Sequence, residues 1–267
     1  MADSRAFPAN APPDQLFEFT PHGVRLHIPR AILTLELWNA FELGYYEGSE
    51  IGALRQAVRP GDRVLEIGGG VGFISTYLLK ELGAASVRTV EADTRLIPII
   101  AATHALNGVS AQVIHAVACR HDGTTTFHQQ EAFWASSVVP LPGGSPVSLA
   151  CVDLGRLVRE EQPEVLVVDI EGGEAGIFEG LDLPGVRSLV VEVHQPQIGG
   201  QGIANCFVAL AEAGFAYDPN GSGGSNVVFS RFESQARPWP ARIRTLLTGL
   251  TRPGPRFWLG GKGKNQR

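Results

Sequence analysis

The stretch Arg63-Val-Leu-Glu-Ile-Gly-Gly-Gly-Val-Gly-Phe73 decides the fold of this chain. Its first half is apolar and typical of a buried strand. The glycines let the backbone turn sharply and approach a ligand with no Cβ in the way. A helix over residues 73–82 is expected to follow. A glycine-rich turn between strand and helix is typical of sites for nucleotide-type cofactors, although it also occurs as a purely structural turn.

Glu66 lies inside this motif, and its charge favours one class of cofactor. A carboxylate aimed into the turn would repel the pyrophosphate of a dinucleotide such as NAD. S-adenosylmethionine has no phosphate, and its ammonium and sulfonium groups are attracted to an acid. A second expected strand, residues 86–93, contains Glu91, whose carboxylate can accept hydrogen bonds from the ribose hydroxyls of either cofactor. The pattern favours S-adenosylmethionine, with a nicotinamide cofactor as the alternative.

The composition indicates a single large α/β domain. The chain has 267 residues, 44% of them hydrophobic, which is enough for a full core. A net charge of -5 gives no sign of a nucleic-acid binder. Cys119, Cys151 and Cys206 are widely spaced, so we expect reduced thiols. Because we find neither an export signal nor an apolar run of membrane-spanning length, we predict a cytoplasmic protein without stable membrane insertion.

Strands and helices alternate from residue 63 onward, which predicts the α/β class with a doubly wound, mostly parallel sheet. The expected strands are 63–67, 86–93, 111–115, 164–170 and 188–194, and the expected helices include 94–107 and 203–213. Two further strands, 214–218 and 226–230, are separated by a glycine-rich turn. They predict an antiparallel hairpin that closes the sheet.

The remaining segments predict the domain boundaries. Residues 1–23 are rich in proline and are predicted to be irregular, and residues 24–230 form the domain. Residues 24–60 are expected to form an N-terminal helical cap with helices at 31–41 and 49–58, the second capped by Ser49. Residues 124–146 are expected to be an insertion, and Asp153 to cap a short helix through residue 160. Residues 231–267 form a basic extension, either solvated or an arm for an anionic partner.

Three carboxylates follow the fourth expected strand in Asp169-Ile-Glu-Gly-Gly-Glu174. Ligands of parallel sheets bind outside the carboxyl ends of central strands, so this acidic cluster and the glycine turn should face one crevice. His194 follows the fifth strand. For Glu171 and Glu174 the alternative role is to stabilise a helix N-terminus, and for His194 it is to be satisfied by hydrogen bonds at a strand end.

These motifs resemble the FkbM family of S-adenosylmethionine-dependent methyltransferases. The resemblance also includes Tyr45-Tyr-Glu-Gly-Ser-Glu50, Asn107 and Val191-Glu-Val-His194. The resemblance covers roughly residues 40–230. It implies a class I methyltransferase-like, Rossmann-like fold and methyl transfer to a hydroxyl of a small natural product, sugar or glycan. The chain departs from the family pattern at Val167, where a lysine is usual, at Glu66, commonly Asp, and at Ala92, often proline.

The resemblance also implies roles for individual residues. The residues expected to bind S-adenosylmethionine are Glu66, Gly68, Gly70 and Gly72 at its methionine end, Glu91 and Ala92 at its ribose, and Asp169 near the reactive methyl. Asp169, Glu171 and His194 are the candidate catalytic residues, because an acceptor alcohol must lose a proton during attack.

Two alternatives stay open. Asp169, Glu171, Glu192 and His194 could offer ligands to Mg²⁺, but our prediction contains no metal. The protein could also be a cofactor-binding scaffold without turnover, to which the loss of the lysine at Val167 would point. The expected acceptor site lies under a cap made by the N-terminal helices and residues 133–146.

Overall fold

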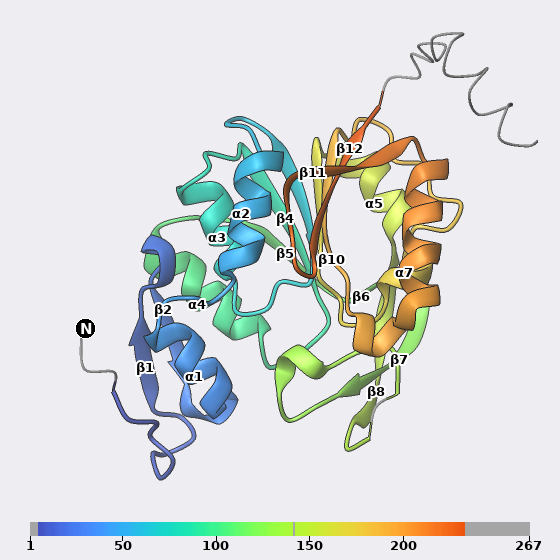
Figure 1. Cartoon of the computed structure of the whole chain (residues 1–267). Coiled ribbons are helices and arrows are strands. Elements are labelled where there is room, and N and C mark those ends of the chain that lie inside the picture. Colours follow the sequence, from blue (N-terminus) through green and yellow to red (C-terminus); the bar gives the residue numbers. More distant parts are fainter. Residues whose placement is uncertain (1–4, 141, 233–267) are drawn as a thin grey trace, which may run out of the picture. The chain divides into compact units, whose positions relative to one another are not determined.

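A seven-stranded sheet in the order β11-β12-β10-β9-β3-β4-β5 forms the centre of the computed structural model, which describes residues 5–140 and 142–232 (Figure 1). The strands are β3 (Arg63–Ile67), β4 (Ser86–Glu91), β5 (Gln112–His115), β9 (Val165–Val168), β10 (Ser188–Glu192), β11 (Phe215–Gly223) and β12 (Asn226–Arg231). β3, β4, β5, β9 and β10 pair in parallel. β12 runs antiparallel to both β10 and β11. The predicted class I methyltransferase-like sheet, closed by a hairpin, is confirmed.

The register brings both sequence motifs to one edge of the sheet. Ile67, the last residue of β3, pairs with Val90 on β4 and with Val168 on β9. The residues that follow these positions are Gly68, Glu91 and Asp169, so all three lie at the carboxyl ends of adjacent central strands. This placement is the one expected for ligand binding in a parallel sheet.

The two faces of the sheet are covered by different helices, as Figure 1 shows. On one face, side chains such as Val64 and Val190 pack with α2 (Gly48–Ala57) and α3 (Phe73–Lys80). On the other face, side chains such as Leu65 and Leu189 pack with α5 (Leu154–Glu161) and α7 (Gln195–Glu212). Strands buried on both faces read as nearly continuous apolar runs, which is why the sequence predicted them well. α4 (Ile97–Asn107) is followed by the predicted C-cap Gly108, which has a left-handed φ of 68°.

The N-terminal region is more regular than predicted. Instead of an irregular segment over residues 1–23, β1 (Leu16–Phe19) pairs with β2 (Leu26–Pro29). Trp38 lies on α1 (Leu35–Glu42), and its ring packs edge-on against the rings of Phe17 and Phe19, with 5.3 Å between ring centroids in each pair. These aromatic contacts give a proline-rich segment enough apolar area to bury. The predicted helix ends were also wrong here, since α1 begins after the cap Thr34, and Glu47 rather than Ser49 precedes α2.

The expected insertion is a second, three-stranded sheet. It contains β6 (Val117–Cys119), β7 (Gly123–Gln129) and β8 (Ser145–Asp153) in the order β6-β8-β7. Cys119 and Cys151 form a disulfide between β6 and β8, so the prediction of three reduced thiols was wrong for this pair. The two lie 32 residues apart, and only the strand pairing brings them together. Cys206 is free and buried.

Two further predictions concern the ends of elements and of the chain. Asp153 caps α5 as expected, because its side chain accepts a hydrogen bond from the backbone nitrogen of Arg156 at 2.5 Å. Within residues 5–140 and 142–232, no helix combines the length and apolar character needed to cross a bilayer. The basic extension lies outside the described residues from position 233 onward.

Trp38→Ala tests whether the N-terminal strands belong to the folded core. The substitution removes a side chain that is 2% exposed, and we expect it to lower the free energy of unfolding by about 3–5 kcal/mol in urea titrations. The control is Val208→Ala, at a side chain that is 56% exposed. It should change the free energy of unfolding by less than about 0.5 kcal/mol. Similar small losses for both variants would contradict the described packing.

Candidate cofactor and active site

A cavity of about 890 Å³ lies at the carboxyl edge of the sheet. Gly68 and Gly70 line it after β3, Glu91 and Ala92 at the end of β4, and Asp169 after β9. The opposite parts of its wall come from α1, from residues 45–47, from the second sheet and from the turn Phe133–Ala135. The cavity therefore joins the two sequence motifs under the cap that the sequence predicted.

Glu91 holds the glycine turn while it faces the cavity. Its Oε2 atom accepts hydrogen bonds from the backbone nitrogens of Gly69 and Gly70 at 2.8 and 2.9 Å. Its Oε1 atom accepts one from the nitrogen of Asp93 at 2.6 Å. Burial raises the pKa of Glu91 to about 7, although these hydrogen bonds oppose the shift. The carboxylate keeps the turn in place and leaves further acceptor capacity for a ligand.

Two glycines of the turn have different reasons to lack a side chain. Gly68 has a φ of +97°, and a Cβ there would lie 1.8 Å from the carbonyl oxygen of Asp169. The turn is thus packed directly against the acidic motif. Gly70 has a φ of +52°, and a Cβ there would meet no protein atom within 4 Å. Because Gly70 lines the cavity, it leaves room for a ligand to approach the backbone.

Glu66 and Gly72 do not line the cavity, unlike the other cofactor residues suggested by the sequence. The side chain of Glu66 is fully buried, and the hydroxyl of Thr89 donates a hydrogen bond to its Oε2 atom. The Oε1 atom of Glu66 has no hydrogen-bond partner within the part of the chain that the structure describes. Burial raises the pKa of Glu66 to about 8. A Cβ at Gly72 would press on Ile100 at 3.0 Å, so this glycine serves helix packing.

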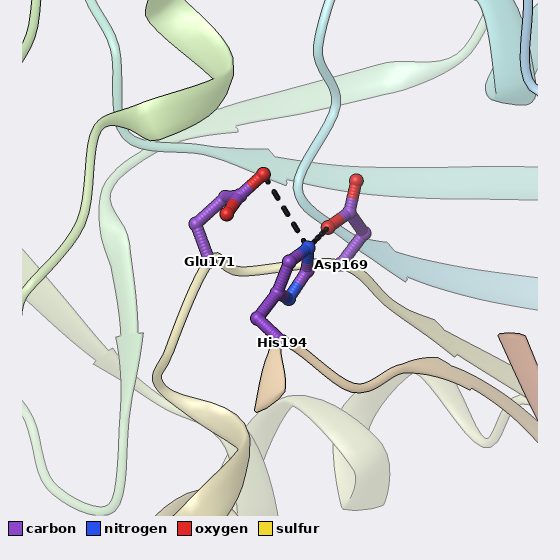
Figure 2. A group of neighbouring side chains, drawn as sticks. All are labelled: Asp169, Glu171 and His194. Atoms are coloured by element: carbon purple, nitrogen blue, oxygen red, sulfur yellow. Dashed lines mark ion pairs between the residues drawn. The ribbon is translucent and has the colours of Figure 1, made fainter. Parts of the chain in front are cut away.

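Asp169, Glu171 and His194 also line the cavity, and Figure 2 shows their side chains pointing toward one another. The Nε2 atom of His194 lies 3.5 Å from Oδ1 of Asp169 and 3.3 Å from Oε1 of Glu171. On the far side of the ring, Nδ1 lies 2.7 Å from Oε1 of Glu174. Glu174 is fully buried and is the first residue of the short helix α6 (Glu174–Ile177). The backbone nitrogen of Gly172 also donates to its carboxylate, at 3.1 and 3.0 Å.

The charges of this cluster shift its titration. Burial lowers the pKa of His194, but hydrogen bonds to Glu171 and Glu174 outweigh burial and raise it to about 11. Burial raises the pKa of Asp169 well above its ordinary value, and the nearby charge of Glu192 adds to this. A protonated imidazole donates hydrogen bonds, so in its protonated form His194 is a donor to Glu171 and Glu174.

Some residues near the site were missed by the sequence analysis. Glu50 is 3% exposed and lines a small cavity of about 30 Å³ beside the glycine turn, together with Glu47. Burial raises the pKa of Glu50 well above its ordinary value, and the charge of Glu47 raises it further. Asp93 lines the main cavity and accepts a hydrogen bond from Gln129 at 2.7 Å. Glu50 ends the motif Tyr45–Glu50 that contributed to the family resemblance, but the sequence analysis assigned it no role, because it lies within a helix whose apolar neighbours dominate the pattern.

The sequence pattern described as the methyltransferase FkbM domain matches residues 66–217. The chain belongs to the FkbM methyltransferase family. The match contains residues of the glycine turn, the second strand end, the acidic motif and the fifth strand end that line one cavity, namely Gly68, Gly70, Glu91, Asp169, Glu171 and His194. As a methyltransferase of this family it uses S-adenosylmethionine as its cofactor, and both the expected family and the expected cofactor are confirmed.

Solved structures of similar fold are distant in sequence. The TYW2 protein of M. jannaschii, solved in complex with AdoMet, is 10% identical, with a TM-score of 0.47 over 83% of this chain and 89% of that chain. The ribosomal protein L11 methylase of Lactobacillus delbrueckii subsp. bulgaricus is 15% identical, with a TM-score of 0.42 over 69% of this chain and 77% of that chain. No curated protein sequence matches this chain. These likenesses assign no substrate.

Gly68→Ala and Gly70→Ala form a matched pair that separates folding from ligand binding. Gly68→Ala should lower the free energy of unfolding by about 3 kcal/mol or more, because its Cβ collides with the backbone of Asp169. Gly70→Ala should cost only about 1–2 kcal/mol, from its left-handed φ. It should nevertheless weaken binding of S-adenosylhomocysteine at least about tenfold, or 1.4 kcal/mol, by calorimetry. Unchanged affinity would place the cofactor elsewhere.

Glu66→Gln tests the buried carboxyl behind the turn. The pKa of Glu66 is about 8 in the folded protein against an ordinary value of 4.5. The folded state therefore retains a proton that the unfolded state loses, and stability should fall as pH rises from about 4.5 to about 8. Glutamine mimics the protonated form, so the variant should be more stable than the wild type by a few kcal/mol at pH 9.

The measurement for Glu66→Gln is urea unfolding of both proteins, without cofactor, between pH 4 and pH 9. The two stability curves should converge at the acidic end, where Glu66 is protonated in both states. A stability difference that stays constant across this range would contradict the raised pKa of Glu66.

Proposed function

We propose that this protein transfers the methyl group of S-adenosylmethionine to a hydroxyl oxygen of a small acceptor bound beside Asp169. The observation that carries this proposal is the single 890 Å³ cavity that joins the glycine turn, Glu91 and the acidic cluster. Its volume lies near the upper end of the range for ligand pockets, about 300–1,000 Å³, which leaves room for a second small molecule beside the cofactor.

The charges around the cavity support a cationic cofactor over a dinucleotide. The acidic residues among its described lining are Glu36, Glu47, Glu91, Asp93, Asp169, Glu171 and Glu192. Arg120 is the one Lys or Arg in that described lining, and its guanidinium pairs with Glu179 at 2.7 Å. A pyrophosphate would be repelled by this lining, whereas an ammonium and a sulfonium would be attracted. The nicotinamide-dependent alternative is therefore disfavoured.

The cofactor fits along the carboxyl edge of the sheet. In our proposal Glu91 accepts hydrogen bonds from the ribose hydroxyls next to Ala92, and the methionine end lies against Gly68 and Gly70. The small cavity beside the turn has room for one ammonium group between Glu47 and Glu50, given its volume of about 30 Å³. Glu66 and Gly72 act indirectly by supporting the turn and the start of α3.

The acceptor fits between the acidic cluster and the cap. Asp169 Oδ1 is inaccessible to solvent and has no hydrogen-bond donor among residues 5–140 and 142–232, so a hydroxyl of the acceptor would satisfy it. Phe133 and Trp134 line the same cavity with their rings 5.2 Å apart. Aromatic faces of this kind suit a hydroxylated natural product or the apolar face of a sugar. Holding the oxygen in line with the sulfonium is the main catalytic requirement for methyl transfer.

Thermal unfolding with added ligands tests the cofactor. S-adenosylhomocysteine at 100 times its Kd should stabilise the folded protein by about 2.7 kcal/mol and raise the midpoint, because it binds the folded state only. NAD at the same concentration should leave the midpoint unchanged. A shift produced by NAD and not by S-adenosylhomocysteine would refute the proposed function.

Asp169→Asn tests the acceptor site with labelled S-adenosylmethionine and a panel of sugars, phenols and hydroxylated natural products. The variant should keep its stabilisation by S-adenosylhomocysteine but transfer the methyl group about a hundredfold more slowly, because the acceptor oxygen is no longer held in place. Equal rates in variant and wild type would remove Asp169 from the mechanism. A wild-type protein that binds the cofactor but methylates nothing in the panel would support the scaffold alternative.

A further inference from the structure

We propose that Asp169, Glu171 and His194 bind a divalent cation of the Mn²⁺ or Mg²⁺ type, and that this ion holds the oxygen of the methyl acceptor. The binding of the cation is argued from the described side chains. The role of the ion in holding the acceptor oxygen rests on the proposed function. The prediction from sequence contained no metal, although it noted these side chains as possible ligands. The structure brings three of the four together and leaves Glu192 outside the group.

The three side chains already have the spacing of metal ligands. One ligand atom from each can be chosen so that all lie within 4.8 Å of one another. The Nε2 atom of His194 is 3.5 Å from Asp169 Oδ1 and 3.3 Å from Glu171 Oε1. Two ligands at about 2.1–2.5 Å from one ion, at right angles to each other, are separated by about 3.0–3.5 Å. A cation could thus be bound with little rearrangement, provided that it displaces the proton from Nε2 of His194, because histidine binds metals as the neutral imidazole.

A second set of contacts orients the ligands. The fully buried carboxylate of Glu174 lies 2.7 Å from Nδ1 of His194, which turns Nε2 toward the cavity. Histidines that bind metals commonly have such a carboxylate behind the ring. The side chain of Gln197 donates to Oε2 of Glu171 at 3.0 Å, and the Oε1 atom of Glu171 is left facing Nε2. His194 and Glu171 are therefore each oriented by a neighbouring side chain, Glu174 and Gln197 respectively.

Asp169 supplies an independent indication that a ligand belongs here. Its Oδ1 atom is buried from solvent and has no hydrogen-bond donor in the part of the chain that is described. A buried carboxylate oxygen without a partner is unfavourable. The nearest contact of this atom in the cluster is His194 Nε2 at 3.5 Å, which is long for a hydrogen bond but suited to two ligands of one ion.

The negative charge of the cluster also favours binding of a cation. Asp169, Glu171 and Glu174 all face the same imidazole, so even a protonated His194 leaves an excess of negative charge. Glu47 and Glu192 add to the potential at Asp169, and no Lys or Arg side chain is among its described ion-pair partners. In the proposed binding mode the ammonium of the cofactor lies at Glu47 and Glu50 and cannot serve this cluster.

The ligand set indicates the kind of ion and its use. Two carboxylates and one imidazole suit oxygen-preferring ions such as Mn²⁺ and Mg²⁺. Three protein ligands leave positions open for an acceptor hydroxyl, whose pKa a bound divalent cation would lower. The acceptor oxygen then forms its bond to the methyl carbon as the carbon–sulfur bond breaks. The electron pair of that bond goes to sulfur, which yields S-adenosylhomocysteine, and the hydroxyl proton leaves to solvent.

The test is titration of chelator-treated full-length protein with Mn²⁺, followed by the electron paramagnetic resonance signal of the free ion. We expect one bound ion per wild-type chain. Asp169→Asn, Glu171→Gln and His194→Gln should each weaken binding at least tenfold. Glu192→Gln is the matched control, because it removes the same charge from the same cavity wall and its partner is Ser225, at 2.7 Å. Because Glu192 contributes charge at Asp169 but no ligand atom, this variant should weaken Mn²⁺ binding by less than threefold.

The outcomes separate this proposal from the proposed function. Stabilisation by S-adenosylhomocysteine is measured on the same samples, and it also shows that each variant is folded. Wild-type protein that responds to S-adenosylhomocysteine but binds no Mn²⁺ at millimolar concentration would overturn the metal site alone. Equal loss of Mn²⁺ binding in Glu192→Gln and Glu171→Gln would overturn the ligand assignment. Loss confined to the three ligand variants, with methyl transfer abolished by chelator and restored by Mn²⁺, would support both parts of the proposal.

Discussion

The contact between Gly68 and the backbone of Asp169 is the constraint on which the site depends. Only a residue without a Cβ fits there, since an added carbon would lie 1.8 Å from the carbonyl oxygen of Asp169. The strand ladder continues through this contact, because Gly68 donates to Val90 and Asp169 donates to Ile67, at 2.9 and 2.8 Å. The cofactor turn and the acidic motif are therefore parts of one backbone arrangement, and a shift of either would move the other.

That arrangement concentrates carboxylates in a small volume, at a cost to stability. Burial raises the pKa of Glu47 and Glu91 to about 7, with Glu192 adding to the shift at Glu47. Glu171 is also held at a left-handed φ of 49°, which is strained for a residue with a side chain. Such unfavourable terms persist when a site is selected for binding rather than stability. Cationic ligands would relieve them, so we expect the ligand-bound protein to be the more stable form.

The sequence predicted the sheet and the position of both motifs because those features depend on local pattern and on strand ends. It did not predict β1, because this strand is stabilised by distant aromatic contacts to Trp38 rather than by its own periodicity. The disulfide between Cys119 and Cys151 depends on strand pairing, which spacing does not encode. The sequence also did not predict that the Glu66 side chain is buried away from the cavity. An acid at a strand end can face either the ligand or the helices that cover the sheet, and the local pattern does not distinguish these two directions.

The register of the sheet connects Glu66 with the departure from the family pattern at Val167. Glu66 on β3 pairs with Val167 on β9 and with Thr89 on β4. Neighbours paired in this way lie on the same face of the sheet, so the lysine usual in the FkbM family would place its ammonium beside Glu66. With a buried valine there instead, the described groups that lower the pKa of Glu66 by hydrogen bonding are uncharged, namely the hydroxyl of Thr89 and the hydroxyl and backbone nitrogen of Ser75. Burial raises the pKa of Glu66, and the valine at position 167 supplies no positive charge to oppose this shift. The substitution thus alters the support behind the glycine turn and leaves the lining of the cavity, where Asp169 and Glu91 lie, unchanged.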